Sequence, residues 1–237
     1  MSRSTVLGFD TATQDVAVGV TRGSEVLTGH RTEPDRGPRH ATELLAEIER
    51  AASEVGGWDS VDALAVGVGP GSFTGLRIGV ATARALAQGL GKPLIGIGTL
   101  DALARGIAER PAARGRPALA VIDARRSQVF AALRDPNGRL AWEPLVAGPE
   151  DLAARVEGLA EAPLAGGDGS LRFRRDLERA GAEVLPDADP GHRLSAAHIC
   201  ALAEGLPGSA PDEIRPIYLR PPDAQLWLER DRGPGWR

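Results

Sequence analysis

A repeated order of strands and helices limits most strongly what this chain can fold into. In its first half, valine-rich segments separated by polar or Gly-Ser turns predict strands, and apolar residues recurring in steps of three and four predict helices. The expected strands are 6–10, 16–21, 25–32, 61–69 and 93–98, and the expected helices are 41–55, 73–90 and 99–110. The order is therefore βββαβαβα.

The second half follows the same order. The stretch 118–148 predicts three strands, and Asn137-Gly138 is a favoured hairpin turn between the second and third. The elements expected after it are a helix at 149–156, a strand at 162–167, and helices at 171–180 and 194–203. Two copies of one order predict an α/β chain made of two similar domains with a cleft between them.

Two stretches with the composition of linkers divide the chain further. "ARGRP" at 113–117 has the composition of a surface hinge, which predicts domains at 1–112 and 113–193. Residues 194–220 are expected to pack back on the first domain. Residues 221–237 are rich in proline and charge and predict a flexible tail.

Composition excludes several classes of function. The net charge of −4 argues against non-specific nucleic-acid binding, and the single cysteine, Cys200, excludes a disulfide framework. No basic-then-apolar leader and no long apolar run is present, so we expect a cytoplasmic protein that does not enter the membrane. All but one of the 28 basic residues are arginine, and because they are scattered they indicate genomic base composition, with no basic functional patch.

The loop "GVGPGSFTGLR" at 67–77 looks like a phosphate-binding loop. A Walker-type loop needs a lysine and a hydroxyl at fixed offsets, and here Gly75 is followed by Leu76 and Arg77. The dinucleotide pattern also fails, because no acidic residue follows about 20 positions on after a second strand. The spacing therefore disfavours a phosphate cradle at this loop.

The helix behind the loop carries the stronger signal. Gly69-Pro70-Gly71 predicts a sharp turn, and Ser72 is placed to cap a helix that begins at Phe73. An apolar seam follows at Phe73, Leu76, Val80, Ala83, Ala87 and Leu90. Small residues flank it at Gly75, Gly79, Ala81, Ala85 and Gly89, which lets another backbone come close. That backbone belongs either to the chain's own sheet or to a partner.

Five segments of the chain resemble the TsaB family, also called YeaZ. They are "VLGFDTATQDVAVGV", "GVGPGSFTGLRIGVATARALAQGLGKPLIGIGTLDALA", "VIDARRSQVFAAL", "AGGDGS" and "IRPIYLRPPDA". The resemblance runs from about Val6 to Tyr218. It implies a fold of two tandem actin-like (ASKHA, ribonuclease H-like) domains, and a non-catalytic subunit that supports the TsaD subunit in transferring the threonylcarbamoyl group to N6 of adenosine in tRNA.

The family also implies a partner surface. Its members pair with TsaD through the helices matching 39–52 and 72–89, and with a second TsaB when TsaD is absent; TsaE joins the larger complex. Carried onto this chain, the interface comprises His40, Leu44, Leu45, Ile48, Phe73, Leu76, Arg77, Val80 and Arg84. tRNA is expected to reach the chain only through the complex.

The resemblance further implies remnants of a nucleotide site between the domains. Its residues are Asp10, Thr11, Thr13, Asp123, Gly166, Gly167, Asp168 and Gly169. The segment Asp123-Ala124-Arg125 lacks the glycine that would let a backbone N–H approach phosphate. Asp10 fits a structural turn as well as a magnesium-linked carboxylate. We therefore expect no strongly bound cofactor here, with ATP or ADP and metal on partner subunits.

Metal chemistry is not indicated. The TsaD family carries two histidines four apart on a helix, whereas here His40 is followed four residues later by Leu44. His192 and His198 are six apart, which one helix face does not bring together. The leading hypothesis is a TsaD-binding scaffold. The rival is a stand-alone ASKHA-type ATPase or phosphotransferase that uses Asp10, Thr11 and the loop 166–169.

Overall fold

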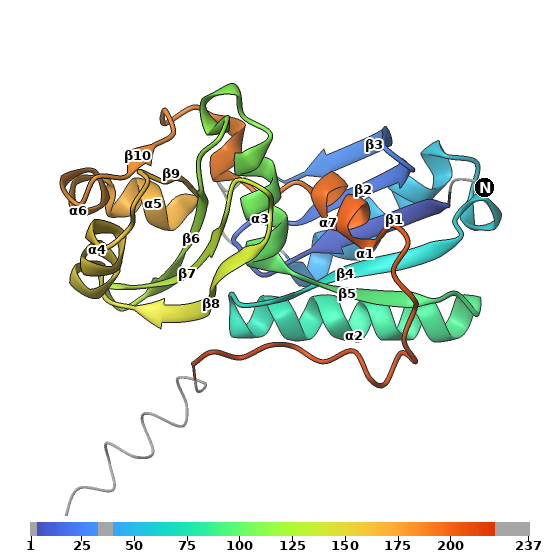
Figure 1. Ribbon diagram of the computed structural model, residues 1–237. Coiled ribbons are helices and arrows are strands. Elements are labelled where there is room, and N and C mark those ends of the chain that lie inside the picture. The colour runs from blue at the N-terminus through green and yellow to red at the C-terminus, as the bar shows by residue number, and fades with distance from the viewer. Residues whose placement is uncertain (1–3, 33–39, 221–237) are drawn as a thin grey trace, which may run out of the picture.

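The computed structural model describes residues 4–32 and 40–220, which form two five-stranded sheets (Figure 1). The strand orders are β3-β2-β1-β4-β5 and β10-β9-β6-β7-β8, so both sheets share one topology. In each, three consecutive strands pair antiparallel, and two later strands extend the sheet in parallel. The duplicated α/β fold predicted from the sequence is confirmed.

The first sheet has helices on both faces, which explains its apolar strands. Its strands are β1 (Thr5–Asp10), β2 (Ala17–Arg22), β3 (Glu25–Arg31), β4 (Ala63–Gly69) and β5 (Leu94–Gly98). Every residue of β1 and β4 is buried, as expected for strands covered on both sides. On one face lie α1 (His40–Glu54) and α2 (Phe73–Leu90), which form a core with Leu7, Phe9 and Leu64. A short turn of 3₁₀ helix, Trp58–Ser60, precedes β4.

The second sheet is covered in the same way. Its strands are β6 (Ala118–Arg125), β7 (Gln128–Arg134), β8 (Leu140–Ala147), β9 (Leu164–Gly166) and β10 (Glu183–Val184). On its outer face α4 (Pro149–Glu157) and α6 (Arg174–Arg179) bury Leu152, Val156 and Leu177 against β6 and β7.

One predicted helix of the second half is wrong. The stretch 171–180 is not a single helix, because α5 (Asp168–Arg172) and α6 meet at Phe173, whose backbone at φ −110° and ψ 27° leaves the helical region. The start also differs, since Asp168 and Gly169, expected in a loop, form the first turn of α5. The repeated order requires a strand between this pair and the last helix, which the sequence did not locate; it is β10, only two residues long.

Two helices fill the space between the sheets by a reciprocal exchange. The helix α3 (Thr99–Ala108) comes from the first half but packs mainly on β6, β7 and β9. The helix α7 (Ala196–Ala203) comes from the second half but packs on β1 and β2. Together they join the inner faces of both sheets into one core. Figure 1 shows α3 standing between the sheets and α7 over the first.

The segment after α7 runs along the first domain beside β5 and α2 (Figure 1). Ser209 N–H donates to Leu94 O at 2.9 Å, and Ile217 N–H donates to Val68 O at 2.7 Å. Ile214 enters the core beneath α1 and α2. The tail predicted at 221–237 lies outside the described residues. Within 4–32 and 40–220, no helix is long and apolar enough to cross a membrane.

Candidate functional site

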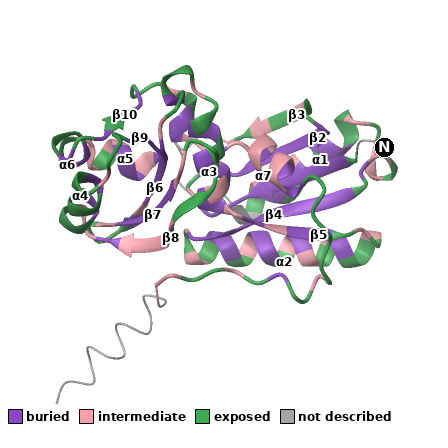
Figure 2. Cartoon of the chain, viewed as in Figure 1, coloured by how far each residue is buried: buried purple, intermediate pink, exposed green. Residues whose placement is uncertain are grey.

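The N-terminus of α2 is built as its sequence predicts. Ser72 is the cap, its Oγ accepting a hydrogen bond from Gly75 N at 3.2 Å, and the helix begins at Phe73. Its C-terminus is closed by Gly91 in the left-handed region. Figure 2 shows α2 with a buried side toward the sheet and an exposed side toward solvent.

The apolar seam of α2 faces the chain's own sheet. Leu76 and Val80 are 1% and 3% exposed, and on α1 both Leu44 and Ile48 are 1% exposed. These four side chains, predicted as partner contacts, belong to the domain core and are not available to a partner. The helical period showed which side of each helix is apolar. That side is covered by the chain's own sheet, at β1, β2 and β4.

One glycine of α2 has its reason inside the same chain. Thr11 Oγ1 donates to Gly75 O at 2.7 Å, and a methyl group on Gly79 would collide with that hydroxyl. Gly79 therefore lets α2 approach the end of β1. Leu76→Glu and Gly79→Glu would therefore disrupt the monomer.

The rest of the predicted interface lies at or near the surface. Leu45 on α1 is 58% exposed. Arg77 is exposed and its guanidinium lies 5.2 Å from the ring centroid of Phe73, while Arg84 is half-buried. His40 begins α1, but its side chain is outside the described residues.

The structure adds residues to this face that the seam did not include. Along α2 the outward positions are Ala81, Ala85, Gln88 and Gly89, all exposed. Tyr218 of the C-terminal segment packs on Phe73 with ring centroids 5.0 Å apart and stays 44% exposed. The small residues flanking the seam were the sequence signal for the α2 positions. We call Leu45, Ala81, Ala85 and Gln88 the α1–α2 face.

Asp10 at the end of β1 is a buried structural carboxylate. Its Oδ1 accepts from Ala12 N at 2.6 Å and its Oδ2 from Thr99 Oγ1 at 2.7 Å, and Gly69 N in turn donates to Thr99 Oγ1 at 3.1 Å. The residue is 1% exposed. Asp10 thus ties β1 to the end of β4 and the start of α3. Both oxygens accept hydrogen bonds from within the chain, which gives this carboxylate a structural role.

Burial raises the pKa of Asp10 from 3.8 to about 6, although the hydrogen bonds from Thr99 and Ala12 oppose the rise. The folded chain then binds this proton more tightly than the unfolded chain. The ionised form costs stability above pH 6, and this cost is relieved as the pH falls toward 4. As the pH is lowered from 7 to 4, the parent should therefore gain roughly 2 kcal/mol of unfolding free energy relative to Asp10→Asn.

Urea unfolding at several pH values measures this difference. Asp59→Asn, which removes an exposed carboxylate, supplies the control for the loss of one negative charge. If the curve of Asp10→Asn ran parallel to that of the parent, Asp10 would not titrate in this range.

A second cluster joins β6 to α5. Asp123 N donates to Asp168 Oδ1 at 2.9 Å, and Arg172 Nη1 donates to both carboxylate oxygens of Asp123 at 2.9 Å. Burial raises the pKa of Asp168, with the hydrogen bond from Asp123 N opposing it. No hydrogen bond or ion pair within the described residues links this cluster to Asp10 or Thr11.

The glycines of this cluster serve packing. Gly167 has φ +103°, and a side chain there would strike Val121 O of β6. Added Cβ atoms at Gly166 and Gly169 would likewise meet backbone atoms of Gly191 and Ile122. Thr13 lies half-buried in the turn after β1. Packing against the chain itself thus accounts for the glycines at 166, 167 and 169.

The histidines have separate surroundings. His192 is buried, with Nε2 3.0 Å from Leu185 O, whereas His198 lies 3.1 Å from Glu109 Oε2 and has its pKa lowered by burial. Within the ranges that the structure covers, no three His, Cys, Asp or Glu side chains are placed to hold a metal ion.

Comparison with known proteins agrees with this geometry. The family model for TsaD, tRNA N6-adenosine threonylcarbamoyltransferase, matches residues 35–162. The tRNA threonylcarbamoyladenosine biosynthesis protein TsaB of Escherichia coli is 32% identical over 91% of this chain and 94% of its own length. An uncharacterised protein of Mycobacterium tuberculosis is 35% identical over 94% of both chains.

A solved structure shows the same fold. YeaZ from Pseudomonas aeruginosa superposes with a TM-score of 0.75 at 28% identity, covering 91% of this chain and all of that one. The paired sheets of one topology and the exchanged α3 and α7 thus form the tandem actin-like, ASKHA-type fold.

Proposed function

The chain belongs to the TsaB (YeaZ) family, and we propose that it serves threonylcarbamoyladenosine synthesis in tRNA as a non-catalytic subunit that binds a TsaD-type transferase. The observation that carries the proposal is the α1–α2 face. It presents small side chains at Ala81 and Ala85 and a 58% exposed leucine, Leu45, on two adjacent helices. Such a face allows close approach of another pair of helices.

Homology supports a TsaD-type partner. The TsaD family model covers α1, α2 and much of the second domain, so a TsaD chain has helices equivalent to these two. Related chains can pair through equivalent surfaces about a pseudo-twofold axis, as identical chains do about an exact one. The same face then serves a homodimer when the transferase is absent, and TsaE joins through the larger complex.

A stand-alone ATPase or phosphotransferase is less well supported. Its candidate groups are committed to the fold: Asp10 accepts two internal hydrogen bonds, and Thr11 donates to Gly75 O. We therefore propose that ATP or ADP and the metal act on partner subunits. Sustained ATP turnover by the isolated chain, lost in Asp10→Asn without loss of folding, would favour the rival.

Association with the transferase tests the proposal directly. The purified chain is mixed with the TsaD of the same organism and run on a size-exclusion column. We expect a complex that elutes ahead of either component and contains both. Separate elution at micromolar concentrations, with both chains folded, would contradict the proposed function.

A further inference from the structure

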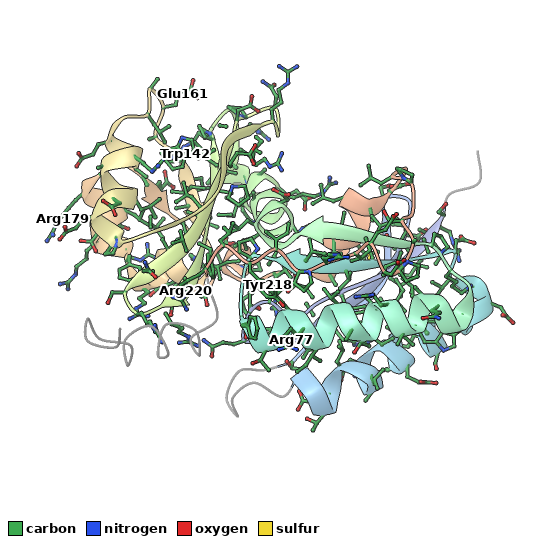
Figure 3. All side chains as sticks on the ribbon, turned by 90° about the horizontal axis from the view of Figure 1, so that it is seen from below. Arg77, Trp142, Glu161, Arg179, Tyr218 and Arg220 are labelled. Carbon is green, nitrogen blue, oxygen red and sulfur yellow. The ribbon has the colours of Figure 1, made fainter. Side chains whose placement is uncertain are left out.

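The outer end of the second domain carries a basic pocket. Four arginines of α5 and α6 line it, Arg172, Arg174, Arg175 and Arg179, together with Asp176 and Asp187. Its volume is about 590 Å³, large enough for a phosphate-bearing group. The arginines that looked scattered along the sequence thus include one cluster. Figure 3 shows Arg179 at the far edge of the molecule.

Two of these arginines are held by the fold. Arg174 Nη2 donates to Asp187 Oδ1 at 2.6 Å and to Leu185 O at 2.7 Å, which ties α6 to the segment after β10. Arg172 pairs with Asp123 and lies 5.2 Å from the ring centroid of Phe173. These contacts fix the shape of the pocket.

The other two arginines are available to a ligand. Arg175 and Arg179 are exposed, and neither has an acidic partner among the residues that the structure describes. They are four apart on α6, so they project from one face of the helix at a spacing of about 5–6 Å between Cβ atoms. Two unpaired guanidinium groups side by side suit neighbouring phosphates better than a single carboxylate.

The basic charge continues from the pocket toward the first domain. Arg125 Nη1 lies 3.5 Å from Asp123 Oδ2, so Asp123 pairs with two arginines, Arg125 beside the pocket and Arg172 in it. The next register pair places Arg125 opposite Gln128, and Gln128 Oε1 accepts from Arg220 Nη1 at 3.2 Å.

Beyond Arg220 the track reaches α2. Two residues earlier, Tyr218 packs on Phe73, and the Arg77 guanidinium lies over the Phe73 ring. Figure 3 shows Tyr218, Arg220 and Arg77 together near the junction of the domains. Basic side chains therefore extend from the α6 pocket to the edge of the α1–α2 face.

The turn between β6 and β7 is part of this track. Arg125, Arg126 and Ser127 all have positive φ, at 64°, 52° and 55°. Such backbone costs roughly 1–2 kcal/mol for each residue other than glycine. Strained backbone of this kind is concentrated at functional sites.

We propose that the α5–α6 pocket and this track bind the phosphodiester backbone of RNA, and that they hold tRNA beside the transferase in the complex. The inference rests on the proposed function, since the transferase supplies the substrate. Arginine forks match phosphate oxygens, and contacts of this kind position RNA without reading its sequence. Because the whole chain has a net charge of −4, only this surface attracts the phosphates of RNA. The isolated chain therefore binds tRNA much more weakly than the complex does.

The double variant Arg175→Gln/Arg179→Gln tests the pocket. Its control is Arg114→Gln/Arg139→Gln, which removes the same charge from two exposed arginines outside the pocket. Each chain is assembled with TsaD, and binding of an unmodified tRNA transcript is measured across a salt series. We expect the pocket variant to bind about tenfold more weakly, with a salt slope smaller by about 1.4–1.8, and the control to match the parent.

Assembly is scored separately from tRNA binding. If the parent chain forms no complex with TsaD, the proposed function fails. If both variants form the complex and bind tRNA with equal affinity and equal salt slope, the pocket proposal fails and the proposed function stands. A third outcome would also overturn the RNA assignment. If inorganic phosphate binds the pocket of the parent, and the pocket variant shows the same salt slope for tRNA binding as the parent, the pocket is a site for small anions.

Discussion

Replacing Ala81 with glutamate is expected to abolish binding to TsaD while leaving the chain folded. Ala81 points outward from α2, so the free chain keeps the new carboxylate in water and its unfolding free energy changes by less than about 0.5 kcal/mol. In a packed helix interface the same carboxylate would be buried without a partner, at a cost of about 3–5 kcal/mol. That cost corresponds to a loss of affinity of 100-fold or more.

A matched control comes from α4. Ala154 is also an exposed alanine, but it lies on the outer face of the second domain, away from the α1–α2 face. Ala154→Glu should bind TsaD like the parent when both are titrated by isothermal calorimetry. Equal affinity of Ala81→Glu and Ala154→Glu would move the interface away from α2.

Leu76→Glu should prevent stable folding. The leucine side chain is 1% exposed, beneath α2, and a glutamate there would leave an ionised group in the core without a partner. The expected penalty of several kcal/mol is comparable with the whole stability of an ordinary domain, about 5–15 kcal/mol. Circular dichroism with thermal melting would show loss of the cooperative transition.

The neighbouring position gives the comparison. Arg77 is exposed one residue along the same helix, and Arg77→Glu should melt close to the parent. A Leu76→Glu chain that melts cooperatively near the parent temperature would show that this side of α2 tolerates charge, and would reopen Leu76 as a surface residue.

The sequence predicted the fold of the first half closely because its strands and helices are regular. Alternation, helical spacing and the Ser72 cap are local signals, and the structure keeps them. The identity of what covers an apolar seam is not local. Leu76 and Val80 fit a partner interface and a domain core equally well in sequence, and only the position of β4 beneath α2 decides between them.

The roles of the residues predicted as a nucleotide-site remnant are not local either. Asp10 and Gly167 have residue types common to phosphate sites, and sequence cannot show that Thr99 comes from 89 residues away to bond Asp10. Nor can it show that Val121 O fills the space beside Gly167. The basic cluster was missed because arginine is frequent throughout the chain, and pairing with Asp123 and Asp187 distinguishes held arginines from free ones.

The exchange of α3 and α7 also orders the events of synthesis on the ribosome. The inner face of the first sheet stays uncovered until residue 203 has left the exit tunnel, since α7 is the helix that closes it. At about 5–20 residues per second, the ~100 residues between β5 and α7 take roughly 5–20 s to emerge. A nascent chain halted near residue 112 would therefore expose a long apolar surface and depend on chaperones, and neither half should be expressible as a separate domain.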